Sequence, residues 1–162
     1  MLREITISDT SDYKAPIAII ASKYNSAYVQ GMLDGVEETL KRAEIPEKDI
    51  VTIRVPGAFE IPVMAAKVAR CNSRKISAII CLGVVIQGET EHARLISEAV
   101  TQELARLQTQ HGIPIVHEVL LVQNEEQARV RCLDEKHNRG REAAQTALEM
   151  ASLVDEFDKQ FA

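Results

Sequence analysis

One stretch near the middle of the chain, ISAIICLGVVIQGETEHARLISEAV (residues 76–100), predicts a strand that leads into a helix. Residues 76–86 are almost wholly apolar, which is typical of a strand that is buried on both faces of a sheet. The polar segment QGETE (87–91) ends this run. From position 91 to position 110, apolar residues recur at the spacing of one helical face. A strand followed by such a helix indicates a βαβ unit.

The same alternation of apolar runs and amphipathic segments extends outward in both directions. Further strands are predicted at residues 16–22, 50–55 and 113–122. Further helices are predicted at residues 26–42, 61–69 and 139–157, together with a short helix that Asn124 caps and that ends at Arg131. Strands that alternate with helices favour a parallel sheet with right-handed crossovers. The sequence therefore predicts a three-layer α/β/α sandwich around a four-stranded parallel sheet.

Length and composition narrow the class of protein. We expect residues 15–162 of the 162 to form one domain, preceded by a polar arm at residues 1–14. The net charge of −5 argues against nucleic acid as a partner, because binding to phosphate backbones needs a basic face. No apolar run approaches the ~20 residues that a membrane helix needs. The three cysteines are odd in number and widely spaced, which favours a reducing, cytoplasmic location without disulfides or a metal site.

Ligands of such sheets bind outside the carboxyl ends of the strands, which here means after residues 22, 55, 86 and 122. Tyr24 follows the first predicted strand, and Phe59 and Glu60 follow the second. Aromatic residues make up only 4% of the chain, so two rings at one edge of the sheet favour a planar, heterocyclic ligand.

The QGETEH segment after the third strand allows two interpretations. Thr90 is expected to cap the following helix, with Gly88 giving the backbone freedom to bend. The free N–H groups of a first helical turn form a site for phosphate, and a histidine in that turn, His92, can transfer protons near neutral pH. Glu89 and Glu91 would repel the phosphate, although Arg131 could supply a compensating cation. The alternative interpretation is ordinary turn and cap chemistry with a structural histidine.

Several motifs together resemble the 6,7-dimethyl-8-ribityllumazine synthase family, from about Pro16 to Leu153. The motifs are KYN (23–25), VPGAFEIP (55–62), LGVVIQGETEH (82–92), EEQARVR (125–131) and NRGREAAQTALEM (138–150). The resemblance implies a flavodoxin-like fold and a transferase of riboflavin biosynthesis. That enzyme condenses 5-amino-6-(D-ribitylamino)uracil with 3,4-dihydroxy-2-butanone 4-phosphate and releases phosphate and water. The resemblance implies that no metal and no organic cofactor is used.

The resemblance also implies roles for individual residues. Tyr24 would stack on the pyrimidine, and His92 would transfer protons. The ribityl-bearing substrate would be held by Ala58, Phe59 and Glu60, and its ring by main-chain groups of Val84, Val85 and Ile86. The phosphate would be held by Thr90, the main chain of Glu89 and Arg131 of a neighbouring subunit. His117 matches an aromatic that closes the pocket of the adjacent subunit. The family forms pentamers, paired pentamers or icosahedral capsids.

Some residues depart from the family pattern and leave alternatives open. Gln87 stands where the family often has a basic residue, and His117 replaces an aromatic that is often Phe. The other departures are Ala93, Arg94, Leu133 and Glu135. An active synthase is the leading hypothesis, and a non-catalytic flavin- or lumazine-binding protein and a shell-forming protein are the alternatives. Retention of Glu60, Thr90, His92 and Arg131 together favours the enzyme, since a shell needs none of them.

Overall fold

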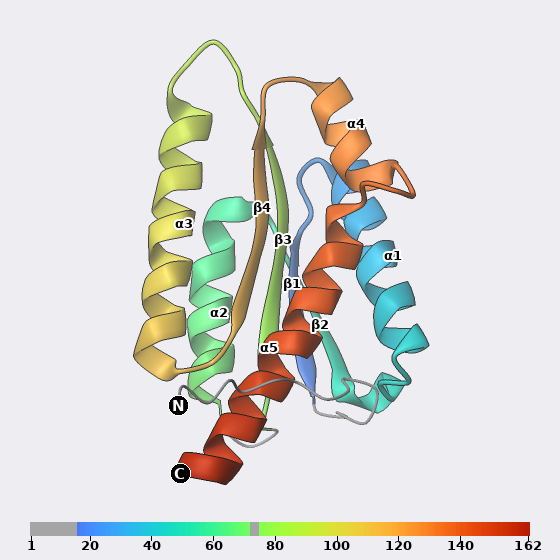
Figure 1. Ribbon diagram of the computed structural model, residues 1–162. Helices are drawn as coiled ribbons and strands as arrows, with labels where there is room; N and C mark the ends of the chain where they lie inside the picture. Colours follow the sequence, from blue (N-terminus) through green and yellow to red (C-terminus); the bar gives the residue numbers. More distant parts are fainter. Residues whose placement is uncertain (1–15, 72–74) are drawn as a thin grey trace, which may run out of the picture.

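The computed structural model describes residues 16–71 and 75–162. The strands are β1 (Ile17–Ser22), β2 (Ile50–Val55), β3 (Ala78–Ile86) and β4 (Ile115–Val122). They form one sheet in the order β2-β1-β3-β4, and every neighbouring pair is parallel (Figure 1). The α-helices are α1 (Ser26–Arg42), α2 (Ile61–Arg70), α3 (His92–His111), α4 (Glu125–Leu133) and α5 (Arg139–Phe161). Two short 3-10 helices are η1 (Glu47–Asp49) and η2 (Ala58–Glu60).

The sheet is buried on both faces. In β1, Ile17 and Ile19 belong to a core with α1, α4 and α5, whereas Ala18 and Ile20 belong to a second core with α2 and α3. This division follows from the alternation of side chains along a strand. Figure 1 shows the two sets of helices on opposite sides of the sheet. The predicted three-layer α/β/α sandwich is confirmed, and its strand order is that of flavodoxin-like folds.

The predicted helices and strands are all present, and the differences lie at their ends. β3 and β4 each begin two residues later than predicted. α4 extends two residues further than predicted, and α5 extends four. Asn124 caps α4 as expected, because its side-chain oxygen accepts a hydrogen bond of 2.9 Å from the N–H of Gln127. The predicted arm, residues 1–14, lies outside the described residues.

Three helices meet around Asn138, which is only 8% exposed. Its amide nitrogen donates to the carbonyl groups of Gly31 and Cys132, each at 2.9 Å. Its side-chain oxygen accepts from the N–H groups of Gly140 and Arg141 at 2.8 and 3.3 Å, and thereby caps α5. A single amide therefore joins α1 and the end of α4 to the start of α5. We call these contacts the Asn138 junction.

The close approach of α1 and α5 depends on glycine. A Cβ atom on Gly140 would lie 1.9 Å from the carbonyl oxygen of Met32, and one on Gly35 would lie 2.5 Å from Oδ1 of Asn138. Both distances are far below van der Waals contact, and the first involves backbone that cannot rotate away. These two residues therefore fix how the helices cross on this face of the sheet.

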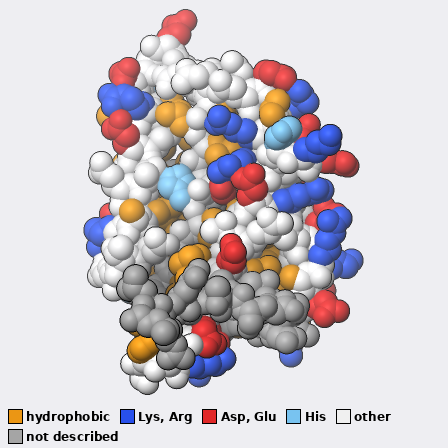
Figure 2. Space-filling model, in the orientation of Figure 1, with side chains coloured by type: hydrophobic (Ala, Val, Ile, Leu, Met, Phe, Trp, Pro, Cys, Tyr) orange, Lys and Arg blue, Asp and Glu red, His pale blue; other side chains and the backbone are white. Residues whose placement is uncertain are grey.

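The surface over α4 and α5 carries charges of both signs. Figure 2 shows Lys, Arg, Asp and Glu side chains interspersed over α4 and α5, with apolar side chains between them. Several of these charges form ion pairs at helical spacing, such as Arg129 with Glu126 and Arg139 with Glu142. Within residues 16–71 and 75–162, no helix is both long and apolar enough to cross a membrane.

Candidate active site

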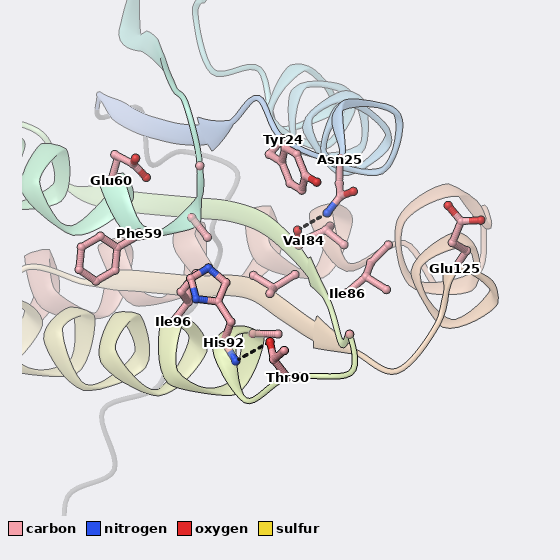
Figure 3. A pocket seen from close by; sticks show the side chains of 15 residues that line it. Tyr24, Asn25, Phe59, Glu60, Val84, Ile86, Thr90, His92, Ile96 and Glu125 are labelled. Carbon is pink, nitrogen blue, oxygen red and sulfur yellow. Dashed lines mark hydrogen bonds between the residues drawn. The ribbon is translucent and has the colours of Figure 1, made fainter.

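A cavity of about 880 Å³ opens at the carboxyl ends of β1, β2 and β3. The connection from β1 leads to β2 on one side of the sheet order, and the connection from β3 leads to β4 on the other. The cavity therefore lies at the switch point between β1 and β3, where ligands of doubly wound sheets bind. Nine of the predicted site residues line it: Tyr24, Ala58, Phe59, Glu60, Val84, Val85, Ile86, Thr90 and His92. Figure 3 shows how the labelled side chains surround one space. The structure thus brings together residues that are up to 68 positions apart in the sequence.

The two aromatic rings at the cavity are strongly exposed. The exposed fractions are 74% for Tyr24 and 63% for Phe59. Removing apolar surface from water is favourable by about 25 cal/mol for each Å² buried. Flat rings also favour stacking on another flat ring. These two side chains are therefore open for contact with a planar ligand or with a second subunit.

Asn25 lines the cavity, although it was not among the predicted site residues. Its backbone is left-handed, with φ of 54° and ψ of 46°, a conformation that asparagine tolerates better than most residues. Its side-chain nitrogen donates a 2.8 Å hydrogen bond to the carbonyl oxygen of Val84, as Figure 3 shows. The preceding N–H groups of Lys23 and Tyr24 donate to the carbonyls of the β2 end. Asn25 therefore ties the turn that carries Tyr24 to β3.

β3 extends further along the sheet than β1. Pairing between the two strands ends at Leu82 of β3, whereas pairing with β4 continues to Ile86. Residues 83–86 consequently pair with β4 on one edge only. The opposite edge of this segment faces the cavity, with Val84 and Ile86 among its lining residues.

The direction of the main-chain groups on this segment follows from the ladder. The N–H groups of Ile79 and Gln87 both donate to carbonyl groups on the β4 side. The direction of the main-chain N–H and C=O groups alternates from one residue to the next along a strand. These groups therefore point toward β4 in the odd-numbered residues of β3 and toward β1 in the even-numbered ones. Val84 and Ile86 therefore direct N–H and C=O groups into the space beyond the end of β1, where the carbonyl of Val84 already accepts the bond from Asn25. Val85 directs its main chain toward β4 and meets the cavity through its side chain.

The loop between β3 and α3 differs in two respects from its prediction. Thr90 is not the N-cap: that position is taken by Glu91, which makes no side-chain cap. Thr90 instead accepts a long hydrogen bond, 3.4 Å, from the N–H of His92 (Figure 3). Gly88 does not have the left-handed backbone that would require glycine, and a Cβ there would meet no atom within 4 Å. Without a capping side chain, the first-turn N–H groups of α3 are open to an anion.

Charges around the cavity are unevenly distributed. Glu60 and Glu125 line it, and no Lys or Arg is among its described lining residues. The carboxylate of Glu91 is bound by Arg94, which also donates to Glu98 at 2.6 Å. These hydrogen bonds raise the pKa of the Arg94 guanidinium and offset the charge of Glu91. Among residues 16–71 and 75–162, no Lys or Arg of the same subunit is therefore placed to pair with an anion inside this cavity.

Three predicted site residues, Glu89, His117 and Arg131, lie outside the lining of this cavity. Arg131 is exposed on α4. His117 lies on β4, where its Nδ1 accepts from the N–H of Val119 at 3.1 Å and its Nε2 lies 2.7 Å from Oγ1 of Thr101. The Val119 bond places the proton of the neutral ring on Nε2, which then donates to Thr101. Burial lowers the pKa of His117.

Among the residues that the structure describes, no group of three or more His, Cys, Asp or Glu side chains could hold a metal ion. The cavity can bind a planar ring between aromatic and main-chain groups, accept hydrogen bonds from hydroxyl groups at Glu60, and place an anion at α3 beside His92. That combination fits a phosphorylated or hydroxylated substrate together with proton transfer.

Comparison with known proteins agrees with this geometry. Residues 14–155 match the family model described as 6,7-dimethyl-8-ribityllumazine synthase. A protein of Halorhodospira halophila (strain DSM 244 / SL1) named 6,7-dimethyl-8-ribityllumazine synthase is 36% identical over 144 residues. The alignment covers 89% of this chain and 91% of that protein. The chain therefore belongs to the 6,7-dimethyl-8-ribityllumazine synthase family.

Proposed function

We propose that this protein condenses 5-amino-6-(D-ribitylamino)uracil with 3,4-dihydroxy-2-butanone 4-phosphate to form 6,7-dimethyl-8-ribityllumazine, with release of phosphate and water. The observation that carries the proposal is that Tyr24, Glu60, Thr90 and His92 line one cavity at the switch point of the sheet, in a chain of this family. A shell-forming role would not require this set of side chains. Riboflavin biosynthesis is the pathway to which such a product belongs.

The pyrimidine substrate would bind along the exposed edge of β3. Its ring stacks on Tyr24, and its polar edge meets the main-chain groups of Val84 and Ile86, which face the cavity. Val85 provides an apolar contact. The ribityl chain runs toward η2, where Glu60 accepts hydrogen bonds from hydroxyl groups and Ala58 and Phe59 line the wall. Figure 3 shows Tyr24 and Glu60 on different sides of the cavity, which suits a ligand with a ring and a chain.

The phosphate of the second substrate would bind at the start of α3. Thr90 and the main chain of Glu89 supply hydrogen-bonding groups there, and the dipole of the 20-residue helix favours an anion. The cavity has no described Lys or Arg of its own. We infer that Arg131 of a neighbouring subunit supplies the cation, and that His117 of a neighbour closes the cavity.

The reaction needs protons moved at several atoms. The amine nitrogen attacks the ketone carbon, and loss of water as the imine forms needs a proton on the departing oxygen and removal of one from nitrogen. His92 is placed to transfer both, which is worth typically ~10²–10⁴-fold in rate. The α3 terminus and Arg131 stabilise the phosphate as it leaves. Holding two substrates together contributes much of the remaining acceleration.

A shared site implies that the protein works as a homo-oligomer. Pentamers, pairs of pentamers or an icosahedral capsid would each bring the Arg131 of one subunit to the cavity of another. Cys81 and Cys132 are buried thiols outside any disulfide, which supports a reducing cytoplasm as its location.

The direct test mixes the purified protein with both substrates and follows lumazine absorbance together with phosphate release. We expect one phosphate for each lumazine, at a rate well above the uncatalysed reaction. His92→Ala and Arg131→Ala should each slow both signals. Arg129→Ala is the matched control, because Arg129 lies on the same helix and pairs with Glu126. No acceleration, with the pyrimidine still bound, would identify a binding protein instead.

A mixing experiment tests whether the site is shared. Subunits with His92→Ala and subunits with Arg131→Ala are refolded or co-expressed together. If two subunits build each site, some mixed sites contain both native residues, and activity recovers above that of either variant alone. Absence of recovery in proven mixed assemblies would show that Arg131 acts within its own subunit.

A further inference from the structure

The loop of residues 87–91 carries Thr90 and leads to His92, yet little of its own backbone fixes it. None of the loop residues has a left-handed backbone. The N-cap position of α3 has no side-chain hydrogen bond, and the bond between Thr90 and the N–H of His92 is long, at 3.4 Å. The conformation of this loop must therefore depend on other contacts.

Gln87 makes those contacts. Its own N–H donates to the carbonyl oxygen of Val122 at 2.8 Å, which fixes the start of the loop to the end of β4. Its side-chain nitrogen donates to the carbonyl oxygen of Gly88 at 3.1 Å and to that of Thr90 at 2.9 Å. One amide group thus joins two carbonyl groups of the loop to a fixed point on the sheet.

We propose that Gln87 is a positioning residue, which holds the loop so that Thr90, the open N–H groups of α3 and His92 face the phosphate-bearing substrate. Gln87 does not line the cavity, whereas Gly88, Thr90 and His92 do. It therefore acts through the loop and does not itself bind the ligand. The inference rests on the proposed function for the identity of the substrate, but the bracing of the loop can be tested without it.

The chemistry of the amide explains why glutamine suits this position. A primary amide nitrogen has two N–H donors, and both carbonyl oxygens that it contacts are acceptors. A carboxylate of the same shape has no donor and would repel both oxygens. A methionine has similar length and no charge, but it also has no donor. Gln87→Met therefore removes the two bonds without adding a charge near the phosphate.

The test compares wild type, Gln87→Met and Gln87→Arg as assembled proteins. The first readout is hydrogen exchange of the amides of residues 88–92, which requires no substrate. Gln87→Met should speed their exchange, whereas Gln87→Arg, which retains donors, should leave it near the wild-type rate. The second readout is kinetic: Gln87→Met should raise the KM for the butanone phosphate about 5- to 30-fold, because two hydrogen bonds of modest net strength are lost. The KM for the pyrimidine should change less than twofold.

Each other result would overturn the proposal. Unchanged exchange in Gln87→Met would show that the loop is held by something else. Faster exchange without a change in the KM for the butanone phosphate would show a local structural role only. An equal rise in both KM values would indicate a general distortion of the cavity. If wild type makes no lumazine, the proposed function fails, and the exchange comparison still decides whether Gln87 braces the loop.

Discussion

The cavity and the Asn138 junction each contain an asparagine whose side-chain amide binds main-chain groups. They differ in how many such hydrogen bonds form and in how far the side chains are exposed. At the junction, Asn138 is 8% exposed and its amide makes four hydrogen bonds to main-chain groups of the same subunit. At the cavity, Tyr24 is 74% exposed, and Asn25 makes one such bond, to Val84. The junction is complete in one subunit, whereas the cavity leaves aromatic side chains exposed. Substitutions at the junction should therefore affect folding, and substitutions at the cavity should affect catalysis.

Glycine substitutions give the largest expected contrast between the two regions. Gly140→Ala places a Cβ 1.9 Å from the carbonyl oxygen of Met32, so α1 and α5 must separate. We expect a loss of at least about 3 kcal/mol in the free energy of unfolding, or no folded protein. Gly88→Ala is the control, since its Cβ meets nothing within 4 Å, and it should change stability by less than about 0.5 kcal/mol. Denaturant titration checks both, and equal stability of the two variants would contradict the comparison.

His92→Ala should show the opposite behaviour. We expect turnover to fall by about 10²-fold or more, within the range for loss of a general acid–base group, while unfolding is unchanged because His92 is exposed. Some activity should remain, since the site still holds both substrates together. Steady-state kinetics and urea titration on the same samples check the pair of expectations. A complete loss of turnover in an intact assembly would contradict the expectation of residual activity. His137→Ala is the control, because His137 is an exposed histidine on another loop.

Asn25 allows a closer comparison, because its side-chain amide donates to a main-chain carbonyl group at the cavity, as the amide of Asn138 does at the junction. Asn25→Gly keeps a residue that tolerates the left-handed backbone but removes the bond to Val84. We expect the KM for the pyrimidine to rise about fivefold, with about 1 kcal/mol lost in stability. Asn25→Asp, which keeps the shape and loses the donor, should give a similar or larger effect. An unchanged KM in both variants would show that the bond does not shape the cavity.

The smallest expected effect concerns His117. Burial lowers the pKa of this side chain below its ordinary value of 6.5. Just below pH 6.5 the unfolded chain therefore binds more protons than the folded one, and the free energy of unfolding should fall as the pH falls. Urea midpoints of wild type and His117→Phe, measured on either side of pH 6.5, check this. As the pH falls below 6.5, the urea midpoint of wild type should fall more than that of His117→Phe. Equal falls in the two midpoints would show that His117 contributes nothing to the pH dependence.

Much of the fold could be predicted from the sequence, because long apolar runs identify strands that are buried on both faces. The run at residues 76–86 and the helical spacing after it sufficed for the βαβ unit, and hence for the edge of the sheet that carries the cavity. The ends of the elements were less certain: α5 continues to Phe161, beyond the last apolar position that the pattern used. Nothing local distinguishes that extension from a frayed end.

The candidate site was predictable where several suggestive residues follow the carboxyl ends of predicted strands. Tyr24, Glu60 and His92 are such residues, and all three line the cavity. Asn25 was missed because its role depends on a left-handed backbone and on a carbonyl group 59 positions away. Thr90 was expected to cap α3 from a common motif, but the helix begins one residue later than that motif requires. Long-range hydrogen bonds and the exact start of a helix are tertiary outcomes that sequence pattern alone does not fix.

The unequal lengths of β1 and β3 have a consequence for how this protein could change over evolutionary time. The open edge of β3 exists because β1 stops at Ser22 while β3 runs on to Ile86. Recognition by main-chain groups would not depend directly on the side chains at positions 84 and 86, which pack in or against the core instead. An insertion that lengthened β1 by two residues would cover the same groups and erase the site, with every side chain around it intact. Under the proposed function, the length of β1 decides whether this edge can bind a ligand.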